Sequence, residues 1–415
     1  MTFPFALTAR LRKARPIHDM QVDVAIIGGG LSGLSLGCLL AQSGVKTVIL
    51  EHLPAATLRT RGHDIRTTAI SAGSSQPLRQ AGIWDTLLPK GCAIDRIDIL
   101  DGSSPVLLHF DRREADNQPF GWIFDNYDLR EALYNRAQAL AAGPDARLTL
   151  LSPATVRDFT VGDDAVTIHL EDGRDVSAAL VVGADGKSSF TRQFMDPPTR
   201  GWSYNQQAIV CLVTHQHAHD NIAVEHFRPE GPFAILPFTD TTDGQHRSAV
   251  VWTEHGNKRE SAMLLDDATF NLGLQARFPA RYGQVSLAGR RAAWPLSLHH
   301  VSSYTAPRML LMAEAAHAMH PIAGQGLNMS LRDVVCLHDL IAGGHYADYG
   351  DPALLAAYET ARRADTMAML GATDALNRLF GNNIAPLKIL RRAGVALVER
   401  CPPVKRFFMR RAMGN

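Results

Sequence analysis

No stretch of the chain is apolar over the roughly 20 residues that a membrane-spanning helix needs. Cysteine is scarce, and the five residues are widely scattered without a CxxC pair: Cys38, Cys92, Cys211, Cys336 and Cys401. This pattern favours a reducing compartment and no structural disulfide framework. The net charge is only +1 over 415 residues, so no global field attracts nucleic acid and we expect no such partner.

The first 19 residues lack an apolar segment and a small-residue cleavage site, so they make a poor secretory signal. They are Arg-rich and free of acid up to Asp19, which leaves a mitochondrial presequence open as a less favoured alternative to a frayed tail. Together with the scattered cysteines, this favours a cytoplasmic location. The content of 46% hydrophobic and 20% charged residues is typical of a globular protein, and the length suits two domains or one elaborated domain.

A dinucleotide-binding pattern stands near the start of the chain. A β-rich run leads into Gly28-Gly29-Gly30-Leu31-Ser32-Gly33, a helical pattern follows, and a second β-rich run ends at Glu51. We expect Gly28 to make the turn, Gly30 to let the backbone approach a pyrophosphate, and Gly33 to let helix and strand pack closely. Glu51 can accept hydrogen bonds from ribose hydroxyls. The pattern does not choose between NAD and FAD.

Two later positions could also contact a nucleotide. Arg66 stands beside the ordered run Thr67–Ser71, and among three arginines of that loop it is the favoured donor to a phosphate or ribityl chain. Asp185 follows a buried strand and precedes Gly186, at the carboxyl end where such sheets usually bind their ligands.

The stretch from Met309 to Val335 predicts a second part of the same site. Its apolar start indicates a buried strand, and Gly324-Gln325-Gly326 opens a new helix. Two glycines at a helix start leave bare backbone N–H groups, with the positive end of the helix dipole behind them. Such a site favours an anion or an electron-rich ring edge.

These patterns predict an α/β fold class: a doubly wound, Rossmann-like domain with an inserted antiparallel-sheet domain and a helical C-terminus. The first domain would comprise residues 21–91, 126–195 and 287–345. Residues 92–125 and 196–286 would form the inserted substrate domain, and residues 346–415 the helical region. The insert contains the apolar strand Phe233–Pro237, one face of which could contact an apolar ligand. Burial in an ordinary hydrophobic core is the commoner explanation for such a strand.

The helical C-terminus is strongly basic. Glu399 is the single acid opposed to eight basic residues: Lys388, Arg391, Arg392, Arg400, Lys405, Arg406, Arg410 and Arg411. A helix over Pro386–Glu399 would have one apolar face. A basic amphipathic segment indicates peripheral contact with a membrane surface, at its inner face, or with a partner; a packed helix with a solvated face is an equal alternative.

Three separated motifs occur together: GGGLSG with Glu51, the Asp185-Gly186 strand end, and PIAGQGLN before a helix. Together they resemble the class A FAD-dependent aromatic hydroxylases over nearly the whole chain. The segments TTAIS, YNQQAIV, AVEHFRPEGPFAILPF and HPIAGQGLNMSLRDV resemble the ubiquinone-biosynthesis hydroxylases, most of all their 2-octaprenyl-6-methoxyphenol hydroxylase branch.

The resemblance implies FAD as a bound cofactor. The three glycines of the first loop would hold its pyrophosphate and Glu51 its adenosine ribose, while Arg130 and Asp185 would lie near the phosphate and ribityl portion. The start of the later helix would face the pyrimidine edge of the isoalloxazine ring and stabilise the charge of reduced flavin. That helix start comprises Gly324, Gly326, Leu327 and Asn328.

The implied activity is a monooxygenase that uses NAD(P)H as a transient co-substrate and O2 to hydroxylate the ring of a polyprenylated phenol, with other ubiquinone-biosynthesis proteins as candidate partners. Pro321 would lie beside the ring where the substrate approaches. Phe233 and His226 are further candidates for the pocket. We assign no catalytic base, because the cofactor supplies this chemistry.

The chain departs from the family at one point: Ala313-Glu314 stands where the family has Gly-Asp. The family's Asp hydrogen-bonds the ribityl chain; Glu314 keeps the charge on a longer side chain, and Ala313 adds a Cβ. We therefore expect weakened or rearranged FAD contacts. A weakly active, flavin-binding scaffold of a biosynthetic complex is one alternative, and a flavin hydroxylase for another apolar aromatic substrate is a second.

Two histidine patterns could suggest a metal. Glu314-x-x-His317 has the spacing of a di-iron ligand pair, but the chain has no second ExxH. His215, His217 and His219 alternate along a strand end without a carboxylate cage, so surface histidines are favoured. We expect no metal.

Overall fold

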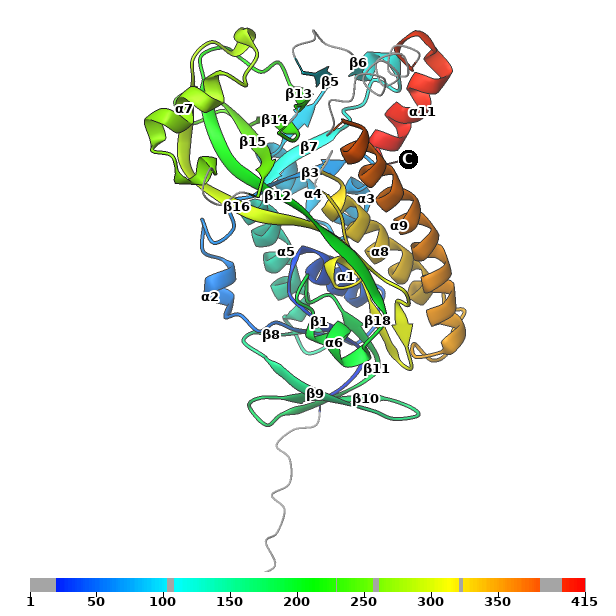
Figure 1. Cartoon of the computed structure of the whole chain (residues 1–415). Coiled ribbons are helices and arrows are strands. Elements are labelled where there is room, and N and C mark those ends of the chain that lie inside the picture. Colours follow the sequence, from blue (N-terminus) through cyan, green and yellow to red (C-terminus); the bar gives the residue numbers. More distant parts are fainter. Residues whose placement is uncertain are drawn as a thin grey trace, which may run out of the picture.

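The computed structural model of the chain describes residues 20–102, 108–228, 230–256, 261–320, 324–380 and 398–414. Three β-sheets with helices packed on them make up this part of the chain (Figure 1). None of the helices within these ranges is long and apolar enough to span a bilayer.

The first sheet is the core of the dinucleotide-binding part. Its main path has the order β17–β18–β11–β1–β2–β8, and the β9–β10 hairpin joins it through β11. The inner strands are parallel. Its strands are β1 (Met20–Ile27), β2 (Thr47–Leu50), β8 (Leu148–Leu151), β9 (Val156–Val161), β10 (Val166–Leu170), β11 (Asp175–Gly183), β17 (Thr305–Ala306) and β18 (Met309–Leu311).

Helices cover one face of this sheet, and the β9–β10 hairpin covers part of the other. Val24 and Ile26 of β1 pack into the helical core, while the alternate residues Ala25 and Ile27 pack against the hairpin side. A parallel sheet buried on both faces requires such apolar runs. The helices of this core include α1 (Leu31–Gln42), α5 (Asn126–Ala141), α8 (Gln325–Ala342) and α9 (Pro352–Phe380).

The second sheet lies beside the first and has the order β19–β16–β12–β15–β14–β13–β5–β6 (Figure 1). It is antiparallel except that β13 and β5 run parallel. The helix α7 (Asp267–Gln275) packs on β16 through apolar side chains such as Phe270. The strands are β5 (Arg96–Asp101), β6 (Leu108–Asp111), β12 (Thr199–His215), β13 (Ile222–Phe227), β14 (Phe233–Phe238), β15 (His246–His255), β16 (Val285–Val301) and β19 (His317–Ala318).

A third, small sheet joins the two larger ones. It has the order β3–β7–β4, from Thr67–Ser71, Gly121–Asp125 and Cys92–Ile94 respectively. Four short helices complete the described fold: α2 (Ala55–Leu58), α3 (Ser75–Gln80), α4 (Trp84–Leu87) and α6 (Phe190–Met195). The amphipathic α11 (Pro402–Ala412) packs Met409 among apolar residues of the second and third sheets.

The predicted α/β fold class is confirmed. The division into domains stays a prediction, although the expected boundary at residue 287 falls inside β16, which pairs with β12 in the second sheet. The helix expected over Pro386–Glu399 lies largely outside the described residues, and α11 begins beyond it.

Candidate active site

A cavity of about 1060 Å³ extends from the glycine loop after β1 to the inner face of the second sheet. Common ligand pockets measure about 300–1,000 Å³, so this cavity has room for more than a small substrate. Eight of the residues predicted to hold the cofactor line it: Gly30, Arg66, Arg130, Glu314, Gly324, Gly326, Leu327 and Asn328.

The glycine loop connects the carboxyl end of β1 to the start of α1. Gly28 has a φ of +109°, and a Cβ there would meet the carbonyl oxygen of Ala184 at 2.5 Å. A Cβ on Gly33 would overlap the Gly28 carbonyl oxygen, whereas one on Gly30 would meet nothing within 4 Å. Gly28 and Gly33 therefore serve the close packing of loop, strand and helix, and Gly30 leaves its backbone open to the cavity.

Glu51 and Asp185 stabilise the backbone around this loop. Glu51 is buried and its carboxylate accepts hydrogen bonds from the backbone N–H groups of Gly29 at 2.7 Å and Leu53 at 2.8 Å. Asp185 accepts from Ser189 Oγ at 2.5 Å and from the Thr191 N–H at 2.9 Å, at the start of α6. Neither carboxylate lines the cavity. Gly30 of the glycine loop and Gly186, which follows Asp185, line it instead.

Arg66 and Arg130 converge on a carboxylate that the sequence did not reveal. Arg66 makes two parallel bonds to Asp64, each 2.8 Å long, and Arg130 Nη2 lies 3.2 Å from Asp64 Oδ2. Burial alone would raise the pKa of Asp64, but the hydrogen bonds and charge of Arg66 outweigh it and hold that pKa well below its ordinary value. Two fixed guanidinium groups against one carboxylate leave a positive wall suited to phosphate.

The start of α8 lines the same cavity. Gly324 caps the helix with a φ of +62°, and a Cβ on Gly326 would meet nothing within 4 Å. Asn328 fixes this turn to β3, since its Oδ1 accepts from the Ser71 N–H and its Nδ2 donates to the Ala69 carbonyl, both at 2.9 Å. The bare N–H end of α8 is thus held rigidly towards the cavity.

The Ala313-Glu314 segment adopts a conformation that suits glycine. Ala313 has a φ of +54°, in the left-handed region, and its N–H donates to Asp333 Oδ2 at 2.9 Å. The Glu314 side chain is exposed towards the cavity, where its charge contributes to raising the pKa of Arg66 after the larger effect of Asp64.

A buried network stabilises this turn from behind. Asp333 of α8 accepts hydrogen bonds from Ala313, from His317 Nε2 at 2.7 Å and from Arg362 Nε of α9 at 2.6 Å. Burial would raise the pKa of Asp333, but His317 and Arg362 outweigh it and lower the pKa below its ordinary value. His317 is therefore committed to a carboxylate, and no metal-binding cluster occurs among the described residues.

The structure corrects two of the three pocket candidates. Phe233 is buried on the far face of the second sheet against Trp252 and Phe278. His226 Nε2 donates to the carbonyl oxygen of Gly102 at 2.7 Å and does not line the cavity. Side chains alternate along a strand, so the neighbours of these two residues line the cavity instead. The third candidate, Pro321, lies outside the described residues.

The cavity fits a flavin dinucleotide. Open space above Gly30 and Gly326 admits a flat or phosphorylated group against bare backbone, and Arg66 with Arg130 supplies positive charge between them. The long side chain of Glu314 reaches the same space. These features point to a flavoprotein, with its cofactor in the cavity that the glycine loop and the N-terminal end of α8 both line.

Residues 21–373 match the family described as FAD binding domain, and the chain belongs to this family. It is 42% identical to ubiquinone hydroxylase UbiL of Rhodospirillum rubrum over 399 residues, covering 96% of this chain and 90% of the relative. It is 31% identical to the 3-demethoxyubiquinol 3-hydroxylase of Escherichia coli over 402 residues, covering 95% and 99%.

Among solved structures, p-nitrophenol 4-monooxygenase PnpA from Pseudomonas putida shares the fold, with a TM-score of 0.76 and 16% identity over 95% of this chain and 98% of that chain. By its family and by the two hydroxylase relatives, the chain is an FAD-dependent monooxygenase, of a class that takes its electrons from NAD(P)H.

Proposed function

We propose that this protein hydroxylates the aromatic ring of a polyprenylated phenol in ubiquinone biosynthesis. One observation supports this substrate above others: the cofactor site and an apolar wall of the second sheet belong to one cavity. That wall includes Ile97, Ile99, Ala223, Ala234, Leu236 and Val251. An apolar tail can pack on it while the ring reaches the flavin. The two relatives above are named as a ubiquinone hydroxylase and a 3-demethoxyubiquinol 3-hydroxylase.

When bound and reduced by NAD(P)H, FAD supplies the activation of O2 and delivers one oxygen atom to the ring. The protein's residues bind and orient. We propose that Gly30, Arg66 and Arg130 bind the diphosphate portion, with Glu51 and Asp185 holding the loops around it. The N-terminal end of α8, from Gly324 to Asn328, would stabilise negative charge on the reduced ring system.

The test is anaerobic reduction of the purified flavoprotein by NADH or NADPH, with and without a short-chain prenylated phenol. Faster flavin bleaching with the phenol, followed by a product heavier by one oxygen atom after O2 is admitted, is the expected result. Equal acceleration by unprenylated phenols would instead support a hydroxylase for another apolar substrate. A bound flavin that no phenol accelerates would support the scaffold alternative.

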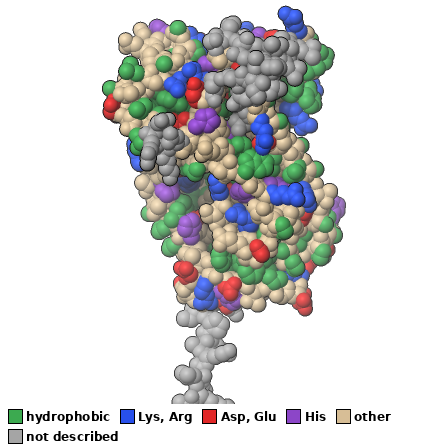
Figure 2. Space-filling view, in the orientation of Figure 1, with side chains coloured by type: hydrophobic (Ala, Val, Ile, Leu, Met, Phe, Trp, Pro, Cys, Tyr) green, Lys and Arg blue, Asp and Glu red, His purple; other side chains and the backbone are tan. Residues whose placement is uncertain are grey.

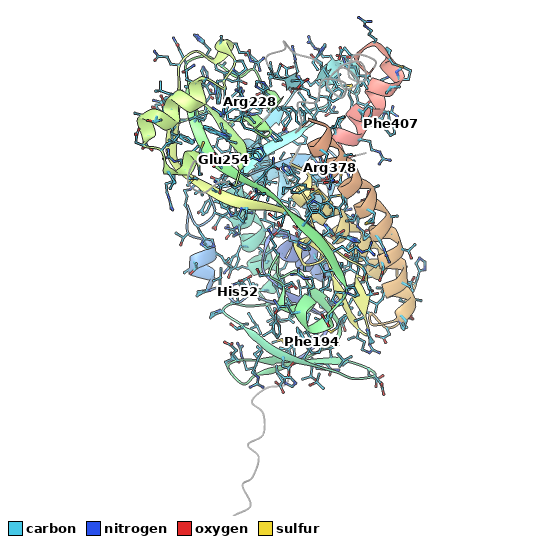
Figure 3. All side chains as sticks on the ribbon, in the orientation of Figure 1. His52, Phe194, Arg228, Glu254, Arg378 and Phe407 are labelled. Atoms are coloured by element: carbon cyan, nitrogen blue, oxygen red, sulfur yellow. The ribbon has the colours of Figure 1, made fainter. Side chains whose placement is uncertain are left out.

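We also propose that α11 contacts the inner face of the membrane. Val404, Phe407 and Phe408 are exposed on this helix, with Arg406 and Arg410 beside them. Apolar and basic side chains lie side by side over α11 at the upper right of Figure 2, and Figure 3 places Phe407 at this edge. This combination is typical of a helix in the plane of an anionic bilayer. Phe408 also lines the cavity, which would give a lipid-soluble substrate a short path.

Binding to vesicles tests this contact. We expect the triple variant Arg406→Gln, Arg410→Gln, Arg411→Gln to lose most of its binding to anionic vesicles, because each basic residue near such a surface contributes about 1 kcal/mol. A control removes three exposed charges of the first sheet's surroundings, at Lys46, Arg147 and Arg157. Equal binding of both triple variants would rule out α11 as the contact.

A further inference from the structure

One ionisable side chain interrupts the apolar wall of the cavity. In the register of the second sheet, Glu225 of β13 stands between Ile99 of β5 and Ala234 of β14. The same row continues through Val251 of β15 to Val210 of β12. All five residues line the cavity, so a carboxyl group stands within a row of hydrocarbon side chains.

Within the described part of the chain, the side chain of Glu225 forms neither a hydrogen bond nor an ion pair. Burial is the sole cause that raises its pKa from 4.5 to about 7. Asp101, two positions beyond Ile99 on β5, is the charged residue of that strand on the same face, and it is buried. Arg66 and Glu314 face the cavity from the cofactor side.

A carboxyl group in apolar surroundings costs stability, and buried polar groups in folded proteins nearly always have partners. Here the side chain faces open space rather than packed atoms, so its partner can be a ligand. Carboxyl groups whose pKa burial brings close to neutral are typical acid–base groups of active sites.

We propose that Glu225 binds the hydroxyl group of the aromatic substrate and accepts its proton during hydroxylation, a role that rests on the proposed function. The phenol O–H bond breaks, its proton moves to a carboxylate oxygen of Glu225, and the electron pair stays on the phenolate oxygen. This raises the electron density of the ring carbon that takes up oxygen. After oxygen addition the C–H bond of that carbon breaks, its proton passes to water and its electron pair restores the aromatic ring, while Glu225 returns its proton to the ring oxygen.

Proton transfer to Glu225 is uphill, because a phenol has a pKa of about 10 and Glu225 one of about 7. The transfer therefore accompanies oxygen addition instead of preceding it, which is the situation that general-base catalysis describes. The carboxyl group also orients the substrate: once it holds the hydroxyl, the apolar tail extends over wall residues such as Leu236 towards Phe408 of α11.

The experiment compares Glu225→Gln and Glu225→Leu with the wild type, all saturated with FAD. Glu230→Gln is the matched control, because Glu230 is an exposed carboxylate on the connection that follows β13. In the first measurement, a singly prenylated phenol and its methyl ether are titrated against the flavin spectrum. We expect the wild type and the control to prefer the phenol by about tenfold, and Glu225→Leu to lose that preference.

The second measurement is turnover across pH. We expect Glu225→Gln to lower kcat by about 100-fold with little change in KM, and to abolish the rise in kcat/KM centred near pH 7. A flavin content equal to that of the wild type and a melting temperature no lower would show that the fold is intact. A Glu225→Gln variant that keeps the wild-type pH profile, or a Glu225→Leu variant that still prefers the phenol, would overturn the assignment.

The two proposals fail in different ways. A wild type that hydroxylates no phenol removes the proposed function, yet the binding comparison still decides whether Glu225 recognises a hydroxyl group. A wild type that hydroxylates the phenol while Glu225→Gln does so equally well removes only the role of Glu225.

Discussion

The two walls of the cavity differ in how they hold charge. The cofactor wall is the side of the cavity that Arg66 and Arg130 line, and there both arginines bind Asp64. Behind this wall, Asp333 accepts hydrogen bonds from three donors. The sheet wall is the apolar wall that the second sheet contributes, and there the Glu225 side chain has no hydrogen-bond or ion-pair partner among the described residues. Paired charges stabilise one geometry, whereas an unpaired one costs stability and is free to react. The paired charges that fix the geometry and the unpaired carboxyl group that can react thus lie on different sides of one cavity.

The largest effect should come from breaking the network behind the cofactor wall. Asp333→Ala leaves Arg362 and His317 buried without their shared acceptor, so the free energy of unfolding should fall by about 3–5 kcal/mol. Denaturant unfolding measures this. Asp365 also pairs with Arg362 but is partly exposed, so Asp365→Asn should cost about 1 kcal/mol or less. Equal losses would mean that burial does not set the strength of this network.

The pair at the cavity surface should matter less. Asp64→Asn removes the charge that Arg66 and Arg130 share, and we expect a loss of about 1–3 kcal/mol in unfolding free energy. The control is Asp172→Asn, which removes an exposed pair with Arg174 and should change stability by less than about 0.5 kcal/mol. If both variants unfold alike, the cofactor wall is not preorganised by Asp64.

On the sheet wall, removing a charge should raise the free energy of unfolding instead of lowering it. Glu225 has its folded pKa raised to about 7 from 4.5, so the folded state loses stability as pH rises through this window and stays weakened above it. Glu225→Leu removes that loss, and we expect a gain of about 1–2 kcal/mol at pH 8 that shrinks by pH 5. Unfolding at the two pH values measures it; a loss at pH 8 would show that Glu225 has a stabilising partner.

The smallest effect should come from the strained turn. Ala313 has a φ of +54°, so Ala313→Gly should raise the unfolding free energy by about 0.5–1 kcal/mol. Ala315, also buried in this turn, is not left-handed, and Ala315→Gly should be destabilising. Combining Ala313→Gly with Glu314→Asp tests the scaffold alternative: a large gain in turnover would support it, and an unchanged turnover would contradict it.

The parts of the site that follow local backbone rules could be predicted from the sequence. Gly28 and Gly324 have the positive φ that their motifs require, and the start of α8 lies at the cavity as expected. The cavity-facing side of β14 could not be predicted, because Phe233–Phe238 is apolar at every position and alternation gives no signal. The available signal was Glu225 on β13, the one carboxyl group in a strand that is apolar apart from Glu225 and His226.

Ion pairs between residues far apart in the chain could not be predicted from the sequence. Asp64 lies two residues before Arg66, yet its bond to Arg130 spans 66 positions. Asp333 reaches Arg362 because α8 packs against α9, and it reaches Ala313 because α8 packs against the turn that contains Ala313. Such partners depend on the tertiary arrangement, which neither spacing nor periodicity specifies.

Gly30 of the first loop and Ala412 of α11 line the same cavity, although almost the whole chain separates them. During synthesis the glycine loop and the apolar sheet leave the ribosome long before α11 does, and domains begin to fold in that order. Until α11 docks, the apolar wall of the cavity is exposed to water and to other nascent chains. A newly made molecule therefore depends on the docking of α11 for protection against aggregation.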